Sequence, residues 1–112
     1  MAKFSIEGKG NFNLVINELH NQIMATSMSV HLEDKESVRF NNFKTELRVY
    51  ERYSFLGKNR VSLTLMLVEY ENNLKLTLIS SGGSQAIFFK INRFGESAFI
   101  NKVIPLAKKL IK

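Results

Sequence analysis

Cysteine and tryptophan are absent from the sequence, and proline occurs once in 112 residues. Without cysteine the chain cannot form a disulfide or hold zinc through thiolates, which excludes zinc-ribbon and thioredoxin-like proteins. The apolar run of a signal peptide is missing after Met1, and no stretch approaches the roughly 20 apolar residues of a membrane span. We therefore expect one soluble, cytoplasmic domain over residues 1–112, long enough to bury a core without a covalent staple.

Sequence motifs of the common enzyme classes are also missing. The chain contains no P-loop, GxGxxG, HExxH or GxSxG pattern. His20 and His31 are the only histidines, and their predicted places on a helix and on the outer side of a strand suggest neither a metal pair nor a catalytic dyad. The loop 81–84 could offer backbone N–H groups to an anion, but we interpret it as a turn because the Lys-Ser/Thr of a phosphate loop is lacking. The sequence thus predicts no catalytic residue, no metal and no cofactor.

Residues 61–81 predict a β-hairpin around which the rest of the chain is organised. The odd positions from Val61 to Leu67 are all aliphatic, and three leucines alternate again between residues 74 and 78. An even-length loop centred on Asn72-Asn73 places both sets of side chains on one face of the hairpin. Asparagine tolerates positive φ, which suits a two-residue hairpin turn.

The first half of the chain predicts a strand, a helix and a second strand. Lys3–Glu7 alternates as a strand and is closed by Gly8-Lys9-Gly10. From an N-cap at Asn11 or Asn13, apolar residues recur at helical spacing through about Ala25, namely Phe12, Val15, Ile16, Leu19 and Ile23. A strand from Met28 to Leu32 is expected to end in a polar turn at 33–36, before an extended path resumes at Val38 and Phe40 with a turn or bulge at Asn41-Asn42.

Phe43–Tyr53 predicts a long strand with two different faces. We assign to the core the face with Phe43, Thr45, Leu47, Val49, Glu51 and Tyr53, and to the opposite face Glu46, Arg48, Tyr50 and Arg52. The predicted core face then contains one acid, Glu51. Because a buried carboxylate must be paired, hydrogen-bonded or near the rim, we place Glu51 at the rim.

The end of the chain predicts a turn at 55–59, an ambiguous strand or packed loop at 86–91, and a last helix opened by Gly95-Glu96-Ser97. Its apolar stripe includes Phe99, Ile100, Val103, Leu106, Ala107, Leu110 and Ile111. Pro105 lies inside this pattern and is expected to kink the helix. The order strand, helix, four or five strands, helix predicts an α+β domain with two helices on one face of an antiparallel sheet, similar to the TATA-binding-protein-like and helix-grip folds.

The charge of the chain is uneven. The formal net charge of +6 arises entirely after Leu56, because acidic and basic residues cancel before it. This excess favours an anionic partner such as nucleic acid. Lysines near the C-terminus have a second explanation, since they stabilise the end of a helix through its dipole.

The second sheet face is the first candidate site. If both helices cover the leucine face, a partly apolar surface stays uncovered on the other side, with candidate interaction residues Arg48, Tyr50, Arg52, Met66, Val68 and Tyr70. We infer a non-enzymatic binding or interaction module that self-associates as a homodimer through this face. The alternative is a nucleic-acid-binding protein that uses the basic C-terminal half and the Arg48, Tyr50 and Arg52 surface.

The second candidate site is one edge of the sheet. Antiparallel pairing brings the end of one long strand next to the start and the end of the hairpin. A small polar pocket for a ligand is predicted there, lined by Glu51, Tyr53, Arg60, Ser81, Gly82, Gly83 and Gln85. An enzyme that uses this pocket is the third hypothesis.

Two stretches resemble those of a known family. Arg48-Val49-Tyr50-Glu51-Arg52-Tyr53-Ser54 and Ser80-Ser81-Gly82-Gly83-Ser84-Gln85-Ala86-Ile87-Phe88-Phe89-Lys90-Ile91 are similar to a family of short bacterial proteins catalogued only as a domain of unknown function. The resemblance covers the whole chain and implies a free-standing bacterial cytoplasmic domain. It implies no activity and no site residues.

Overall fold

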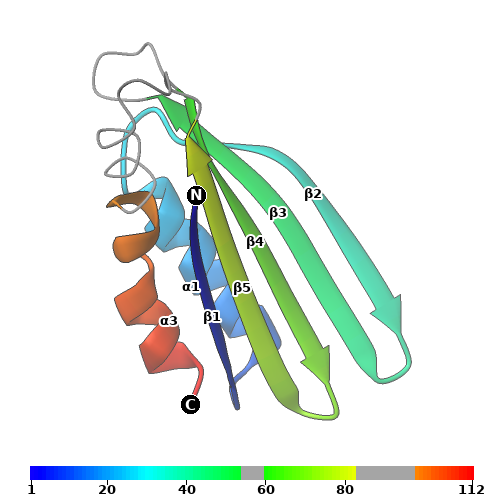
Figure 1. The fold of residues 1–112 in the computed structure, drawn as a ribbon. Coiled ribbons are helices and arrows are strands. Elements are labelled where there is room, and N and C mark those ends of the chain that lie inside the picture. Colours follow the sequence, from blue (N-terminus) through cyan, green and yellow to red (C-terminus); the bar gives the residue numbers. More distant parts are fainter. Residues whose placement is uncertain (54–59, 83–97) are drawn as a thin grey trace.

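The computed structural model describes residues 1–53, 60–82 and 98–112. In these residues the elements run in the order β1 (Ala2–Gly8), α1 (Phe12–Met24), β2 (His31–Phe40), β3 (Phe43–Tyr53), β4 (Arg60–Tyr70), β5 (Asn73–Gly82) and α3 (Ile104–Leu110). The strands form one antiparallel sheet in the order β1-β5-β4-β3-β2. Both helices lie on the same face of the sheet (Figure 1). The predicted two-layer α+β architecture is confirmed, with four strands after the first helix.

The β4–β5 hairpin supplies the central part of the core, as predicted. Its leucines all lie on the helix side and are at most 1% exposed, namely Leu63, Leu65, Leu67, Leu74, Leu76 and Leu78. Tyr70 pairs with Asn73, so the two turn residues are Glu71 and Asn72, both with positive φ (51° and 69°). The predicted turn at Asn72-Asn73 is therefore wrong by one residue, although the loop has the even length that keeps the leucines on one face.

Helix α1 packs along this leucine surface through the predicted stripe. Phe12, Val15, Ile16, Leu19 and Ile23 are all buried. The helix begins after Asn11, whose side-chain oxygen accepts a hydrogen bond from the Leu14 N–H at 2.9 Å. This is the side-chain cap that satisfies an N–H group left without a partner in the first helical turn.

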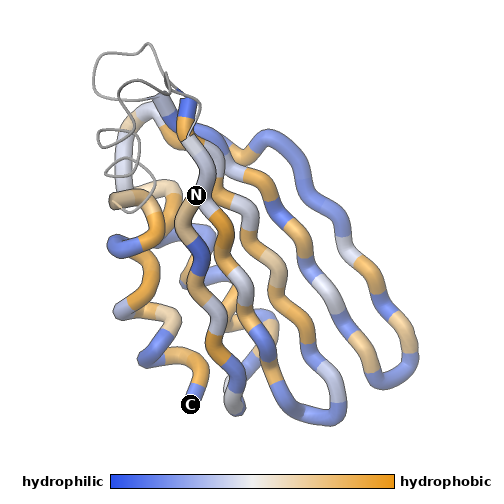
Figure 2. Tube along the Cα trace, in the orientation of Figure 1, coloured by the Kyte–Doolittle hydropathy of each residue, from blue (hydrophilic) through white to orange (hydrophobic). Residues whose placement is uncertain are grey.

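Strand β2 differs from its prediction. It is continuous from His31 to Phe40, and the polar run at 33–36 is strand, not a turn. The register with β3 shifts between Leu32 and Asp34, which makes Glu33 the extra residue of a β-bulge. In Figure 2 the part of β2 at residues 33–36 is hydrophilic throughout, while the central strands alternate. The expected turn at Asn41-Asn42 is confirmed as the β2–β3 connection.

The faces of β3 are reversed relative to the prediction. Tyr50 pairs with Leu63 and Arg48 pairs with Leu65, so the even-numbered residues of β3 share the helix side with the leucines. Tyr50 is 0% exposed and Glu46 is 4% exposed. The residues assigned to the core lie on the other face, where Leu47 and Tyr53 are exposed. Glu51 therefore lies on the face opposite the buried leucines, and the prediction that it belongs to the core face is wrong.

The C-terminal segment covers the same leucine surface in two steps. Residues 98–101 are helical, residues 102–103 form a turn, and α3 begins at Ile104 with Pro105 in its first turn. The single proline thus starts a new helix instead of kinking a continuous one, because its missing N–H has no helical partner at that position. Phe99, Ile100, Val103, Ala107 and Ile111 of the predicted stripe are buried, and Leu106 and Leu110 pack partly buried against the core.

Two glycines let the β1–α1 connection lie against the end of α3. A Cβ atom on Gly8 would lie 2.6 Å from the backbone carbon of Lys112, and one on Gly10 would lie 2.6 Å from the carbonyl oxygen of Leu110. The Lys112 N–H donates to the Lys9 carbonyl at 2.9 Å. Only glycine allows this close approach of two backbones. The predicted turn at 55–59, the segment 86–91 and the helix start at 95–97 lie outside the described residues.

The turn geometry predicts that Glu71→Asn stabilises the protein. Glutamate in the left-handed region is strained, whereas asparagine is favoured at the first position of a type I′ turn. We expect the free energy of unfolding to rise by about 0.5–1 kcal/mol, measured by urea denaturation. Glu18→Asn, the same change on the exposed surface of α1, should be neutral or slightly destabilising. Equal effects of both substitutions would contradict the explanation.

Candidate functional site

The face of the sheet opposite the helices, here called the open face, carries a strip of apolar side chains. No helix or strand among the described residues lies over it (Figure 1). Leu47 is 37% exposed and Met66 is 36% exposed, and further half-buried members of the strip are Val49, Val68 and Ile79. Contiguous exposed apolar surface of this kind marks interaction sites in proteins.

Cross-strand pairing arranges the open face in rows, one of which has opposite charges at its two ends. One row runs through Lys3, Ile79, Thr64, Val49 and Asp34 from β1 to β2. The next row runs through Ser5, Thr77, Met66, Leu47 and Glu36. The centre of both rows is apolar or carries only a hydroxyl group. Thus, in these two rows, the β1 end carries one base and the β2 end carries two acids.

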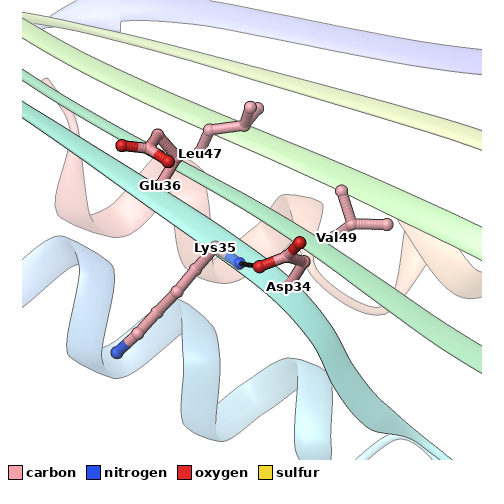
Figure 3. Close-up of a pocket in the computed structure, with 5 residues that line it drawn as sticks. All are labelled: Asp34, Lys35, Glu36, Leu47 and Val49. Carbon is pink, nitrogen blue, oxygen red and sulfur yellow. Dashed lines mark hydrogen bonds between the residues drawn. The ribbon is translucent and has the colours of Figure 1, made fainter.

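A shallow cavity of about 160 Å³ lies at the acidic end of these rows. Figure 3 shows Leu47 and Val49 beside Asp34 and Glu36, while the Lys35 side chain extends on the other side of β2 toward α1. The Lys35 backbone N–H donates to Asp34 Oδ1 at 2.8 Å, which orients this carboxylate. The cavity therefore has an apolar floor with two carboxylates at its rim, next to the open-face strip.

The predicted cluster at the sheet edge does assemble in part, but on the open face. Glu51 forms an ion pair with Arg60, and Tyr53 pairs with Arg60 across the strands. Glu51, Ser62 and Ser81 follow one another in a row, with the two serine hydroxyls 2.9 Å apart. Gly82 ends β5 opposite Val61, while Gly83 and Gln85 lie outside the described residues.

His31 adds an imidazole to this cluster that the sequence prediction had treated as isolated. It pairs with Glu51 across β2 and β3, and its Nε2 contacts a carboxylate oxygen of Glu33. One ligand atom from each of the three side chains lies within 4.8 Å of the other two. The His31-x-Glu33 spacing, which can place two possible ligands close together on a strand, was the signal in the sequence. The prediction of a turn at 33–36 left this pair unrecognised.

The surface proposed for nucleic-acid bases does not exist as predicted. Arg48, Tyr50 and Arg52 lie on the helix side, whereas Met66, Val68 and Tyr70 lie on the open face. Tyr50 is fully buried and shares a 2.8 Å hydrogen bond with His20 Nδ1 of α1. The Arg52 guanidinium lies 4.4 Å from the centre of the Phe99 ring. A platform on which bases stack against these residues is therefore wrong.

The buried polar residues of β3 instead form a compensated network centred on Glu46. One carboxylate oxygen accepts from the Ser37 hydroxyl at 2.5 Å, and the other accepts from Arg48 Nε at 3.0 Å. Arg39 lies 3.5 Å from the first oxygen. These partners satisfy a charge that could not otherwise be buried.

This environment shifts the pKa values of Glu46, His20 and Tyr50. Burial alone would raise the pKa of Glu46, but the hydrogen bonds from Ser37 and Arg48 and the positive charges of Arg48 and Arg39 hold it below its ordinary value. Burial lowers the pKa of His20, and the charges of Arg48 and Lys35 lower it further. Burial raises the pKa of Tyr50. These groups stabilise the fold between sheet and α1, and they do not converge on the open-face cavity.

Comparison with known proteins adds a family but no activity. A family model described as a family of unknown function (DUF6054) matches residues 1–111. The match confirms the resemblance to a domain of unknown function. No curated protein matches the chain. Among the described helices, none has both the length and the apolar character needed to cross a membrane.

The Glu46 network predicts a pH-dependent stability. Glu46→Gln should lower the free energy of unfolding by about 1.5–3 kcal/mol at neutral pH, since it removes charge-assisted hydrogen bonds. Because the folded-state pKa is depressed, this contribution is fully present above the unfolded-state pKa and is lost as the pH falls through the folded-state pKa. Urea denaturation at descending pH should show the wild-type and mutant curves converging. Glu7→Gln, in an exposed 3.8 Å pair with Lys75, is the control and should change stability little.

Proposed function

The chain belongs to DUF6054, a family of unknown function, and we propose that it is a non-enzymatic interaction module that pairs with a second copy of itself through the open face. The observation that carries this proposal is the apolar strip centred on Leu47 and Met66. More than a third of the surface of each of these two residues is exposed to water. Burying this strip against an identical strip removes apolar surface from water on both copies.

The size of the open face suits such an interface. Five strands about 4.8 Å apart and roughly 30 Å long present on the order of 700 Å² of sheet. A stable protein interface of standard size buries about 800 Å² on each partner. Face-to-face packing of two sheets, with side chains interdigitating between them, is a common arrangement in β-sandwiches.

The charges at the ends of the rows favour one orientation. A two-fold axis parallel to the strands would place the β1 edge of one copy over the β2 edge of the other. Lys3 would then face Asp34 of the second copy, twice in each dimer, and the acidic rim of the cavity would receive the base. Met66 lies on the central strand, so it would lie near Met66 of the second copy.

The other face-to-face two-fold axis, which runs across the strands, is disfavoured by the same rows. If this axis passes through the row that contains Met66, Glu36 would face Glu36 of the second copy. The same axis would place the charged Lys75 of one copy against Ile79 of the other, and Ile79 lies in the apolar strip. Like charges in contact and a base placed against apolar surface both weaken an interface.

Met66→Glu is expected to convert the dimer to a monomer. A charge at the centre of the interface would be buried without a partner and near its own copy, which should weaken association roughly a hundredfold or more. Light scattering coupled to gel filtration measures the mass, at chain concentrations on the order of tens of micromolar. Leu14→Glu, which alters an exposed leucine on α1, is the matched control and should leave the dimer intact. A monomeric wild-type protein would refute self-association.

The orientation is tested by exchanging the charges of Lys3 and Asp34. Each single change, Lys3→Glu or Asp34→Lys, should weaken the dimer roughly three- to tenfold, because like charges then face each other. The double variant should recover most of the lost affinity. Sedimentation equilibrium gives the dissociation constants. Additive losses in the double variant would rule out the strand-parallel axis while leaving the use of the open face standing.

A further inference from the structure

We propose that His31, Glu33 and Glu51 form a binding site for a divalent transition-metal ion, and that Zn²⁺ fits it best. The three side chains come from two neighbouring strands of the rigid sheet. His31 and Glu51 are directly paired, and Glu33 follows at the bulge that shifts the register of β2. One nitrogen and two carboxylate oxygens lie within 4.8 Å of one another.

The orientation of the imidazole is an independent observation that points to a cation. His31 Nδ1 lies 3.1 Å from the Ser29 carbonyl oxygen, which is an acceptor only. Nδ1 therefore carries a hydrogen, and Nε2 is the ring atom that faces the Glu33 carboxylate. A positive charge must lie between Nε2 and this carboxylate, and either a proton on Nε2 or a metal ion can supply it. A carbonyl that fixes the ring in this way is the usual partner of a metal-bound histidine.

The donor set selects the class of ion. One imidazole with two carboxylates suits Zn²⁺ and its neighbours, whereas Mg²⁺ and Ca²⁺ prefer sites made only of oxygen atoms. Zinc bonds of about 2.0–2.2 Å set the donor atoms roughly 3–3.5 Å apart. The contacting atoms of His31 and Glu33 must therefore separate slightly to admit the ion, with the Glu51 oxygen at a similar distance. The side chains of His31 and Glu33 are 50% and 36% exposed, so they are free to make this adjustment. Water would complete the coordination.

Arg60 competes with the proposed ion for Glu51. Its guanidinium forms an ion pair with one oxygen of that carboxylate, and the Arg60 side chain is 59% exposed. Metal binding would release Arg60 toward solvent, which is possible without movement of the backbone. The arginine thus gives the site a signature that a purely structural ion-pair cluster lacks: its removal should tighten the binding of zinc.

Isothermal titration of the full chain with zinc chloride at neutral pH tests the site. We expect a single ion per chain, with affinity lowered at least about tenfold in His31→Gln and in Glu33→Gln. Arg60→Gln should raise the affinity roughly three- to tenfold by removing a repelling charge. His20→Gln changes the only other histidine, which lies on the helix side, and is the matched control with unchanged affinity. Magnesium chloride should bind far more weakly than zinc.

Two results would overturn this proposal. Wild-type protein that gives no heat of binding up to millimolar zinc would show that the cluster is an imidazolium–carboxylate ion pair. Binding that survives in His31→Gln but disappears in His20→Gln would place the ion elsewhere. The same titration on the Met66→Glu variant separates this site from self-association, because all three ligands come from one copy.

Discussion

The burial of six leucines on one side of the β4–β5 hairpin is the constraint on which the other placements depend. Each fully buried leucine contributes about 1.5–3 kcal/mol, whereas an ordinary hydrogen bond between uncharged groups contributes about 0.5–1.5 kcal/mol. The two helices reach these side chains only from that side, so both cover the same face. The opposite face is left without a second layer among the described residues, although apolar residues lie on it. The candidate interaction surface is thus a by-product of where the core had to be.

Much of this arrangement could be predicted from periodicity. The buried stripe of α1 and the leucine face can be read from the sequence, because apolar residues recur about every 3.6 residues along a helix and every 2 residues along a strand. The hairpin loop was misplaced by one residue, which changes the strand register by two but leaves every side chain on its predicted face. The α1 cap at Asn11 and the convergence of Glu51, Tyr53, Arg60 and Ser81 at one edge were predictable for similar local reasons.

The faces of β3 could not be predicted because hydropathy ignores pairing. Residues 43, 45, 47 and 49 are the more apolar set, yet Glu46 and Arg48 occupy the buried side, where each neutralises the other and Ser37 supplies a further hydrogen bond. The face is set by the number of residues between β3 and β4, which leaves no hydropathy signal. In β2 the polar run resembled a turn because an edge strand tolerates polar residues on both faces. That error hid Glu33, and with it the cluster at His31.

The first and the last of the described strands, β1 and β5, are neighbours in the sheet. This pairing has a consequence for how the chain folds. β1 lies next to residues 74–80, so its contacts close a loop that spans most of the chain. Hairpins β2–β3 and β4–β5 can form from local contacts, whereas β1 must wait for β5. Until then the backbone groups along one side of β5 are unpaired beside a row of leucines. During synthesis this transient edge is the segment most able to join another nascent chain, so docking of β1 protects the protein from aggregation.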